Sequence, residues 1–266
     1  MNTRRLPTLA MAAVIAIPMV LGGCFSSMSW QTADTIPDDA VEFGMGWSVA
    51  KLDRISYTSQ EGEVTEVSDD LEGTIPNLLP DLFMRFGLGD NIDMGLRLHF
   101  LGIHTDLKIR LINTDLFSLA LAPGLGYSRP LIVFGEYSAD LPLLLTFKLG
   151  KMVKLYLSGH GRISGWSMEL STEDDEENDN IHTLGFGANV GLQFGTKTWF
   201  IRPEVGYINH FFGFEDKCRE KLELSWFNFG LGFGFVFGTQ DEAQDDKIKR
   251  LEDRLDQLET EKKQNS

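Results

Sequence analysis

The stretch that decides the fold is WFNFGLGFGFVF, residues 226–237. Read in steps of two, one face carries Phe227, Phe229, Leu231, Phe233, Phe235 and Phe237, and the other carries Asn228, Gly230, Gly232, Gly234 and Val236. Alternation with a period of two predicts a β-strand. A face of phenylalanine needs an apolar medium, which is either the core of a soluble barrel or sandwich or the acyl chains around a transmembrane barrel.

The same alternation recurs along the chain and predicts about ten strands, within a range of 8–12. The connections after odd-numbered strands are mostly long, whereas those after even-numbered strands are all short, a pattern typical of barrels with long outer loops and tight periplasmic turns. The predicted strands are 41–50, 82–88, 92–100, 107–111, 117–128, 141–149, 153–162, 183–194, 199–207 and 226–237. Segment 53–77 is expected as a long polar loop and 129–140 as a medium loop.

The second face of these strands mixes glycine with charges of both signs. A soluble barrel would place Lys and Glu at most of these water-facing positions, whereas a narrow lumen needs small residues and paired charges. We therefore expect a charged, mostly filled lumen that does not allow open diffusion. The predicted lumen charges are Arg85, Asp93, Arg97, Asp106, Lys108, Arg110, Lys154, Arg162, Arg202 and Glu204.

Four aromatic residues near strand ends suit a membrane interface, where amphipathic rings gather. They are Trp47, Trp199, Tyr207 and Trp226. The predicted fold is all-β, an up-and-down antiparallel transmembrane β-barrel over residues 41–238.

Over residues 41–237 the chain resembles bacterial outer-membrane β-barrel proteins in architecture, although no single family is indicated. The resemblance implies the outer membrane of a Gram-negative-type bacterium, with its lipids and lipopolysaccharide as surroundings. It also implies a barrel insertion machinery that reads a closing strand with a terminal aromatic residue. Here the chain continues past Phe237, so insertion must tolerate the tail.

Residues 1–23 form a predicted signal peptide, with Arg4 and Arg5 before a short apolar run. The final Leu-Gly-Gly-Cys resembles the lipobox of bacterial lipoproteins, which implies that Cys24 is lipidated and begins the mature protein. Lipidation would leave Cys218 as a lone thiol. The alternative is an ordinary signal peptide with a coincidental cysteine. Residues 24–40 are expected as a periplasmic tether.

Residues 239–266 predict a periplasmic helical tail, because Ile248, Leu251, Leu255 and Leu258 follow a 3, 4, 3 spacing. Two heptads alone are marginal for a stable coiled coil. The tail is therefore either a solvated helix or a short coiled coil that self-associates or docks on a periplasmic protein.

Charge and motifs limit the function classes. The net charge is −15, and −17 once Arg4 and Arg5 are removed, so nucleic acid is excluded as an expected partner. The acid run 173–177 lacks the spaced ligands and central glycine of a calcium loop, and we expect a solvated outer loop. No metal or cofactor is predicted.

The histidines are not joined to a nucleophile at an informative spacing, so catalysis is not expected. They are His99, His104, His160, His182 and His210. The expected role is structural or one of surface interaction. Three alternatives stay open: a small-solute channel, a rim-sited enzyme that modifies lipid A, and a lipid-anchored soluble β-barrel that binds a small ligand.

Overall fold

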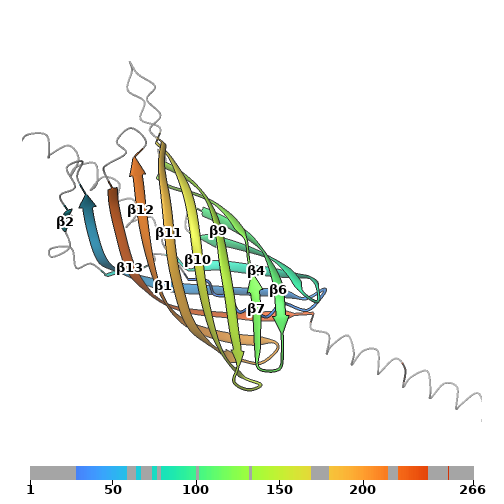
Figure 1. The fold of residues 1–266 in the computed structure, drawn as a ribbon. Helices are drawn as coiled ribbons and strands as arrows, with labels where there is room; N and C mark the ends of the chain where they lie inside the picture. Colours follow the sequence, from blue (N-terminus) through green and yellow to red (C-terminus); the bar gives the residue numbers. More distant parts are fainter. Residues whose placement is uncertain are drawn as a thin grey trace, which may run out of the picture.

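The structure is a computed structural model, and it describes residues 28–58, 64–66, 74–76, 79–99, 102–131, 134–168, 180–214, 221–238 and 251. These residues form a closed antiparallel β-barrel (Figure 1). The strands are β1 (Val41–Thr58), β2 (Val64–Glu66), β3 (Thr74–Pro76), β4 (Asp81–Gly89), β5 (Ile92–His99), β6 (Gly102–Asn113), β7 (Phe117–Leu121), β8 (Gly124–Leu131), β9 (Phe134–Lys148), β10 (Val153–Met168), β11 (Asn180–Gly195), β12 (Trp199–Phe214) and β13 (Lys221–Phe237).

Ten positions make up the barrel wall, because β7 and β8 follow each other in the single position between β6 and β9, and β2 and β3 only flank β1. Each wall strand pairs with its neighbour in sequence, and β1 pairs with β13 to close the barrel, with Val41 opposite Phe237. The ten-stranded all-β barrel predicted from the alternation is confirmed.

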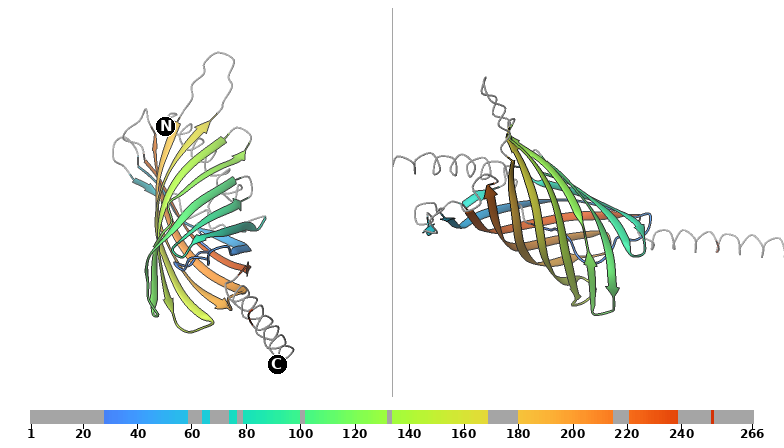
Figure 2. Two further views of the ribbon diagram at one scale, coloured as in Figure 1. Left: turned by 90° about the vertical axis from the view of Figure 1, so that its right-hand side faces the viewer. Right: turned by 45° about the horizontal axis from the view of Figure 1, so that its top comes forward.

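The two ends of the barrel differ. Short connections at 90–91, 114–116, 149–152 and 196–198 lie at one end, here called the turn end, where β1 begins and β13 also ends. The opposite end is called the loop end. The wall is uneven in height: strands β9–β13 run for 15–17 residues and β1 for 18, whereas β4–β6 run for 8–12 (Figure 2).

Three details differ from the sequence prediction. The strand expected over 117–128 is interrupted before Gly124, where Pro123 lacks the N–H that a ladder needs. The loop expected over 129–140 is mostly strand, because β8 runs to Leu131 and β9 starts at Phe134. The long loop expected over 53–77 contains the end of β1 as well as β2 and β3.

The outer face is apolar and exposed along the whole wall. Phe229, Leu231 and Phe235 on β13 are each about half exposed, at 49–50%. Their neighbours of opposite parity, such as Asn228, are buried inside. Among the residues described, no helix is long and apolar enough to cross a membrane.

Candidate functional site

Residues 28–36 lie inside the barrel, within the stretch 24–40 that the sequence predicted as a tether. Ala40 stays at the turn end, since its carbonyl accepts a hydrogen bond from Gly87 N at 3.0 Å. The chain then reaches into the lumen as far as Met28, and the side chains of Met28 and Trp30 are almost fully buried. Residues 28–36 are called the inserted segment below. It lacks a strand pattern because its main chain bonds lumen side chains instead of a neighbouring strand.

Trp30 is the largest side chain of the inserted segment, and it lies against a groove of glycines on β1 and β13. A Cβ at Gly46, Gly230 or Gly232 would come within 3.0 Å of the indole ring. The Trp30 backbone is left-handed, with φ of 49°, a conformation that residues other than glycine rarely adopt. Gly46, Gly230 and Gly232 therefore make room for this ring.

Glu204 on β12 binds the tip of the inserted segment. Its carboxylate accepts hydrogen bonds from Ser29 N at 2.6 Å, Trp30 N at 3.0 Å and the Tyr156 hydroxyl at 2.8 Å. Arg97 donates to the carbonyls of Met28 and Ser29. Both N–H and C=O groups at the tip are thus paired with charged side chains of the lumen, which is the strong class of hydrogen bond.

A cluster of four charges on β4, β5 and β6 holds the middle of the segment. Arg85 bonds Asp93 at 2.5 Å and Asp106 at 2.6 Å, and Lys108 pairs with Asp93 at 3.1 Å. The cluster also bonds the inserted chain, because Lys108 donates to the carbonyl of Asp34 at 2.7 Å. Each charge in the cluster therefore has an opposite charge beside it, as buried ions require.

Two further ion pairs complete the contacts. Arg202 on β12 bonds Glu42 on β1 at 2.8 Å and also donates to the carbonyl of Trp30. Near the turn end, Asp34 pairs with Lys154 at 2.6 Å and accepts a hydrogen bond from Ser118. Burial acts to raise the pKa of the Asp34 carboxyl, but Lys154 and the hydrogen bonds outweigh it and hold this pKa at about 2.

The structure brings most of the predicted lumen charges together inside the barrel. Six are buried, namely Arg85, Asp93, Asp106, Lys108, Arg202 and Glu204, and Arg97, Lys154 and Arg162 are partly buried. Arg110 lies elsewhere: it bonds the Asn91 side chain at 2.9 Å in an exposed turn.

The predicted interface aromatics divide. Trp47, Trp199 and Tyr207 are exposed on the outer face, at 36–45%, and their place at a membrane interface stays a prediction. The expectation does not hold for Trp226, which is 6% exposed and stacks on His210 with ring centroids 5.0 Å apart. Trp226 has the parity of Asn228 and Gly230, so it belongs to the inward face.

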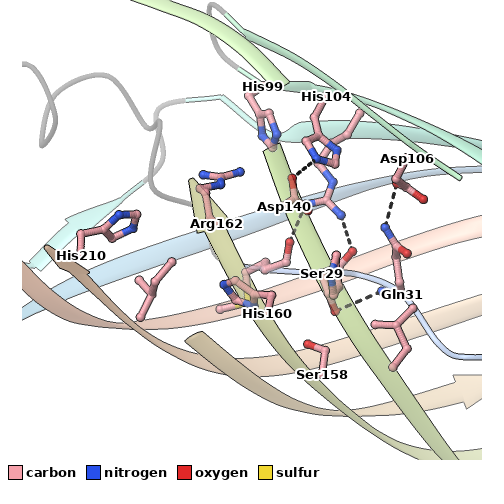
Figure 3. A pocket seen from close by; sticks show the side chains of 15 residues that line it. Ser29, Gln31, His99, His104, Asp106, Asp140, Ser158, His160, Arg162 and His210 are labelled. Carbon is pink, nitrogen blue, oxygen red and sulfur yellow. Dashed lines mark hydrogen bonds and ion pairs between the residues drawn. The ribbon is translucent and has the colours of Figure 1, made fainter. Parts of the chain in front are cut away.

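A cavity of about 50 Å³ lies on the loop-end side of the inserted segment (Figure 3). Residues of the inserted segment border it, together with β5, β6, β9, β10 and β12. His104 Nε2 lies 2.6 Å from Asp140 Oδ1 in its wall. The polar lining residues are Ser29, Gln31, Arg97, His99, His104, Asp106, Asp140, Ser158, His160, Arg162 and His210.

Four of the five histidines therefore share one cavity, whereas His182 is exposed. Within the described ranges, no three His, Cys, Asp or Glu side chains are placed to hold a metal ion. Cys24, Cys218, the acid run 173–177 and nearly all of the tail 239–266 lie outside the described residues.

Comparison with solved structures returns outer-membrane β-barrel proteins of low sequence identity. The OmpT outer membrane protease of Escherichia coli is 9% identical, with 74% of this chain and 96% of that chain covered and a TM-score of 0.42. Neisserial surface protein A is 15% identical, with 73% and 96% covered and a TM-score of 0.34. Ail, the attachment invasion locus protein of Yersinia pestis, is 12% identical, with 75% and 99% covered and a TM-score of 0.30.

The chain resembles outer-membrane β-barrel proteins at the level of class. No protein-family model matches it. No curated protein matches it in sequence.

The inserted segment is the part of the site that sequence reasoning missed. One signal for it exists, because inward glycines pair across the seam, with Gly46 opposite Gly232. Glycines side by side on adjacent inward faces leave space that a bulky group must fill. Trp30, in a stretch with few charges, is the nearest candidate in the sequence.

Proposed function

We propose that the chain is an outer-membrane β-barrel whose lumen is closed by its own inserted segment, and which acts through its surface as a structural or interaction protein. The apolar outer wall supports the membrane location, because exposed Phe and Leu on every wall strand would be costly in water. Acidic loops at the loop end are the proposed contact with lipopolysaccharide or other surface partners.

The proposal of a closed lumen rests on the inserted segment. Trp30 fills the glycine groove, and the main chain of residues 28–34 bonds to Glu204, Arg97, Lys108 and Arg202. The remaining cavity of about 50 Å³ holds only a few water molecules, since one water needs about 10–15 Å³ on this measure. A small-solute channel would need the segment to leave.

Lipidation at Cys24 and a periplasmic helical tail over 239–266 are part of the same proposal. Three residues lie between Cys24 and the buried Met28, and these four steps along an extended chain span at most about 14 Å. An acyl anchor at Cys24 must therefore enter a leaflet close to the barrel. A Cys24→Ser variant that left the membrane as a soluble protein would contradict the membrane-spanning barrel.

Planar-bilayer recording tests the closed lumen. The full-length protein, reconstituted from detergent, should give no stepwise current in 1 M KCl. A variant lacking residues 28–36 serves as the comparison, because the same wall without the segment should conduct. Stable single-channel steps from the unaltered protein would overturn the closed lumen and favour the channel alternative.

A further inference from the structure

The inserted segment has a direction inside the barrel, and its contacts with β5 show which one. This strand starts at the turn end, and Asp93, its second residue, accepts a hydrogen bond from Ile36 N at 3.0 Å. Arg97, close to the loop-end terminus of the same strand, donates to the carbonyl of Met28 at 2.6 Å. Read backwards from Ile36, the chain therefore rises through the lumen from the turn end towards the loop end.

The lumen on the turn-end side of Met28 is filled. Trp30 occupies the glycine groove there, and residues 30–33 are buried, with exposed fractions of 0–7%. The cavity of about 50 Å³ lies on the other side of Met28, where His160 and His210 form part of its wall (Figure 3). A chain that continues from Met28 towards residue 24 therefore meets free volume on the loop-end side and packed side chains on the turn-end side.

The wall beside Met28 is low, because β4 and β5 are only 9 and 8 residues long (Figure 2). Met28 packs in one cluster with Phe83, which lies two residues from the loop-end start of β4. On the next strand, β5 ends two residues beyond Arg97. Two residues of a strand rise by about 7 Å, whereas the four steps from Met28 back to Cys24 span at most about 14 Å. Cys24 is therefore within reach of the space above this rim.

The outer face of the low wall is apolar up to its rim. Leu98, next to the end of β5, is 43% exposed, and Leu79, just before β4, is 50% exposed. An outward face that is apolar to its edge suits the hydrocarbon layer around a transmembrane barrel. Acyl chains that reach this edge from the lumen would leave water for an apolar medium, which is the favourable direction of transfer.

We propose that the chain leaves the lumen at the loop end, over the rim of β4 and β5, so that lipidated Cys24 anchors the protein in the leaflet on the loop-end side. Residues 24–27 lie outside the described part of the chain, and their exit is assigned from the course of residues 28–36. This exit replaces the periplasmic tether predicted for 24–40. The chain after β13 leaves at the turn end, so the two chain ends lie on opposite sides of the membrane.

The position of the anchor rests on the proposed membrane location and lipidation, whereas the direction of exit applies equally to a chain without lipid. Cysteine labelling on intact Gram-negative cells tests that direction. Cys218→Ser, which removes the second cysteine, is the parent for two variants: Ser26→Cys, before the inserted segment, and Gln240→Cys, just after β13. A charged maleimide that does not cross the outer membrane should label Ser26→Cys as fully on intact cells as after permeabilisation. Gln240→Cys, the matched control, should be labelled only after permeabilisation.

Labelling of Ser26→Cys only after permeabilisation, or only after denaturation, would overturn the exit at the loop end. Labelling of both variants on cells that retain a periplasmic marker protein would place both chain ends on one side and overturn it as well. The Cys218→Ser parent separates the two proposals, because label on its own Cys24 would refute lipidation and leave the direction of exit standing. Loss of the parent from the membrane fraction would refute the membrane-spanning barrel and the anchor with it.

Discussion

Two sectors of the lumen wall hold the same inserted segment in different ways. The sector formed by β13 and β1 offers glycine, and it binds the ring of Trp30 by shape. The sector formed by β4, β5 and β6 offers Arg85, Asp93, Asp106 and Lys108, and it binds the main chain by hydrogen bonds.

The two sectors stabilise the inserted segment through different interactions. In the glycine sector the Trp30 Nε1 atom has no hydrogen-bond partner among the described residues, so the stabilisation there is packing and the removal of apolar surface from water. In the charged sector the cost of burying each ion is offset by its neighbours, and the loss of one partner leaves the others uncompensated. The glycine sector should therefore tolerate small changes gradually, whereas the charged sector should fail abruptly.

The largest effect is expected in the charged sector. Arg85→Met should lower the free energy of unfolding by about 3–5 kcal/mol, because Asp93 and Asp106 are left buried without their common partner. Denaturant unfolding in detergent measures it, and Arg110→Met is the exposed control. A loss no larger than that of the control would mean that the cluster is not holding the wall.

A smaller effect is expected in the glycine sector. Trp30→Ala should cost about 3 kcal/mol by emptying the groove. Gly232→Val should cost about 1–3 kcal/mol, since its side chain would meet the ring, whereas Gly159→Ala on β10 has no neighbour within 4 Å and is the control. The double variant should show less than the sum of the two losses. Strict additivity would contradict a direct fit between the ring and Gly232.

The smallest effect is expected at the turn end. The folded pKa of Asp34, about 2, lies below its ordinary value of 3.8. The ionised carboxylate therefore stabilises the fold above pH 4 and loses this contribution as the pH falls towards 2. Asp34→Asn should cost about 1–2 kcal/mol at pH 7 and almost nothing at pH 2. A difference from the parent protein that did not change with pH would exclude the ion pair with Lys154 as its cause.

The wall of the barrel was predictable because each strand carries its own evidence. Alternation in 199–207 or 226–237 assigns every residue to a face before any partner is known. The same parity rule, applied to Trp226, places it inside, so position near a strand end was the weaker guide. The break between β7 and β8 at Pro123 was also predictable, because proline lacks the backbone N–H that donates to the strand ladder.

The inserted segment could not be predicted in the same way. Ser29 bonds Glu204, 175 residues away, and Gln31 bonds Asp106, 75 residues away. Such contacts depend on the stagger of the strands around the barrel, which fixes the inward-facing residues that lie at the same height along the barrel axis. The sequence supplied the charges of the lumen, but their pairing required the closed wall.

The seam between β1 and β13 also has a consequence for the order of folding. Its residues lie at the two ends of the barrel sequence, with Val41 opposite Phe237, and contacts this distant in sequence form late because a long loop must first be closed. Trp30 is separated from the start of β1 by ten residues and lies on this seam, against Gly46 and Gly232. Because the ring packs on both strands, its contacts are complete only when the two strands meet, so the step that shuts the barrel also completes the packing of Trp30.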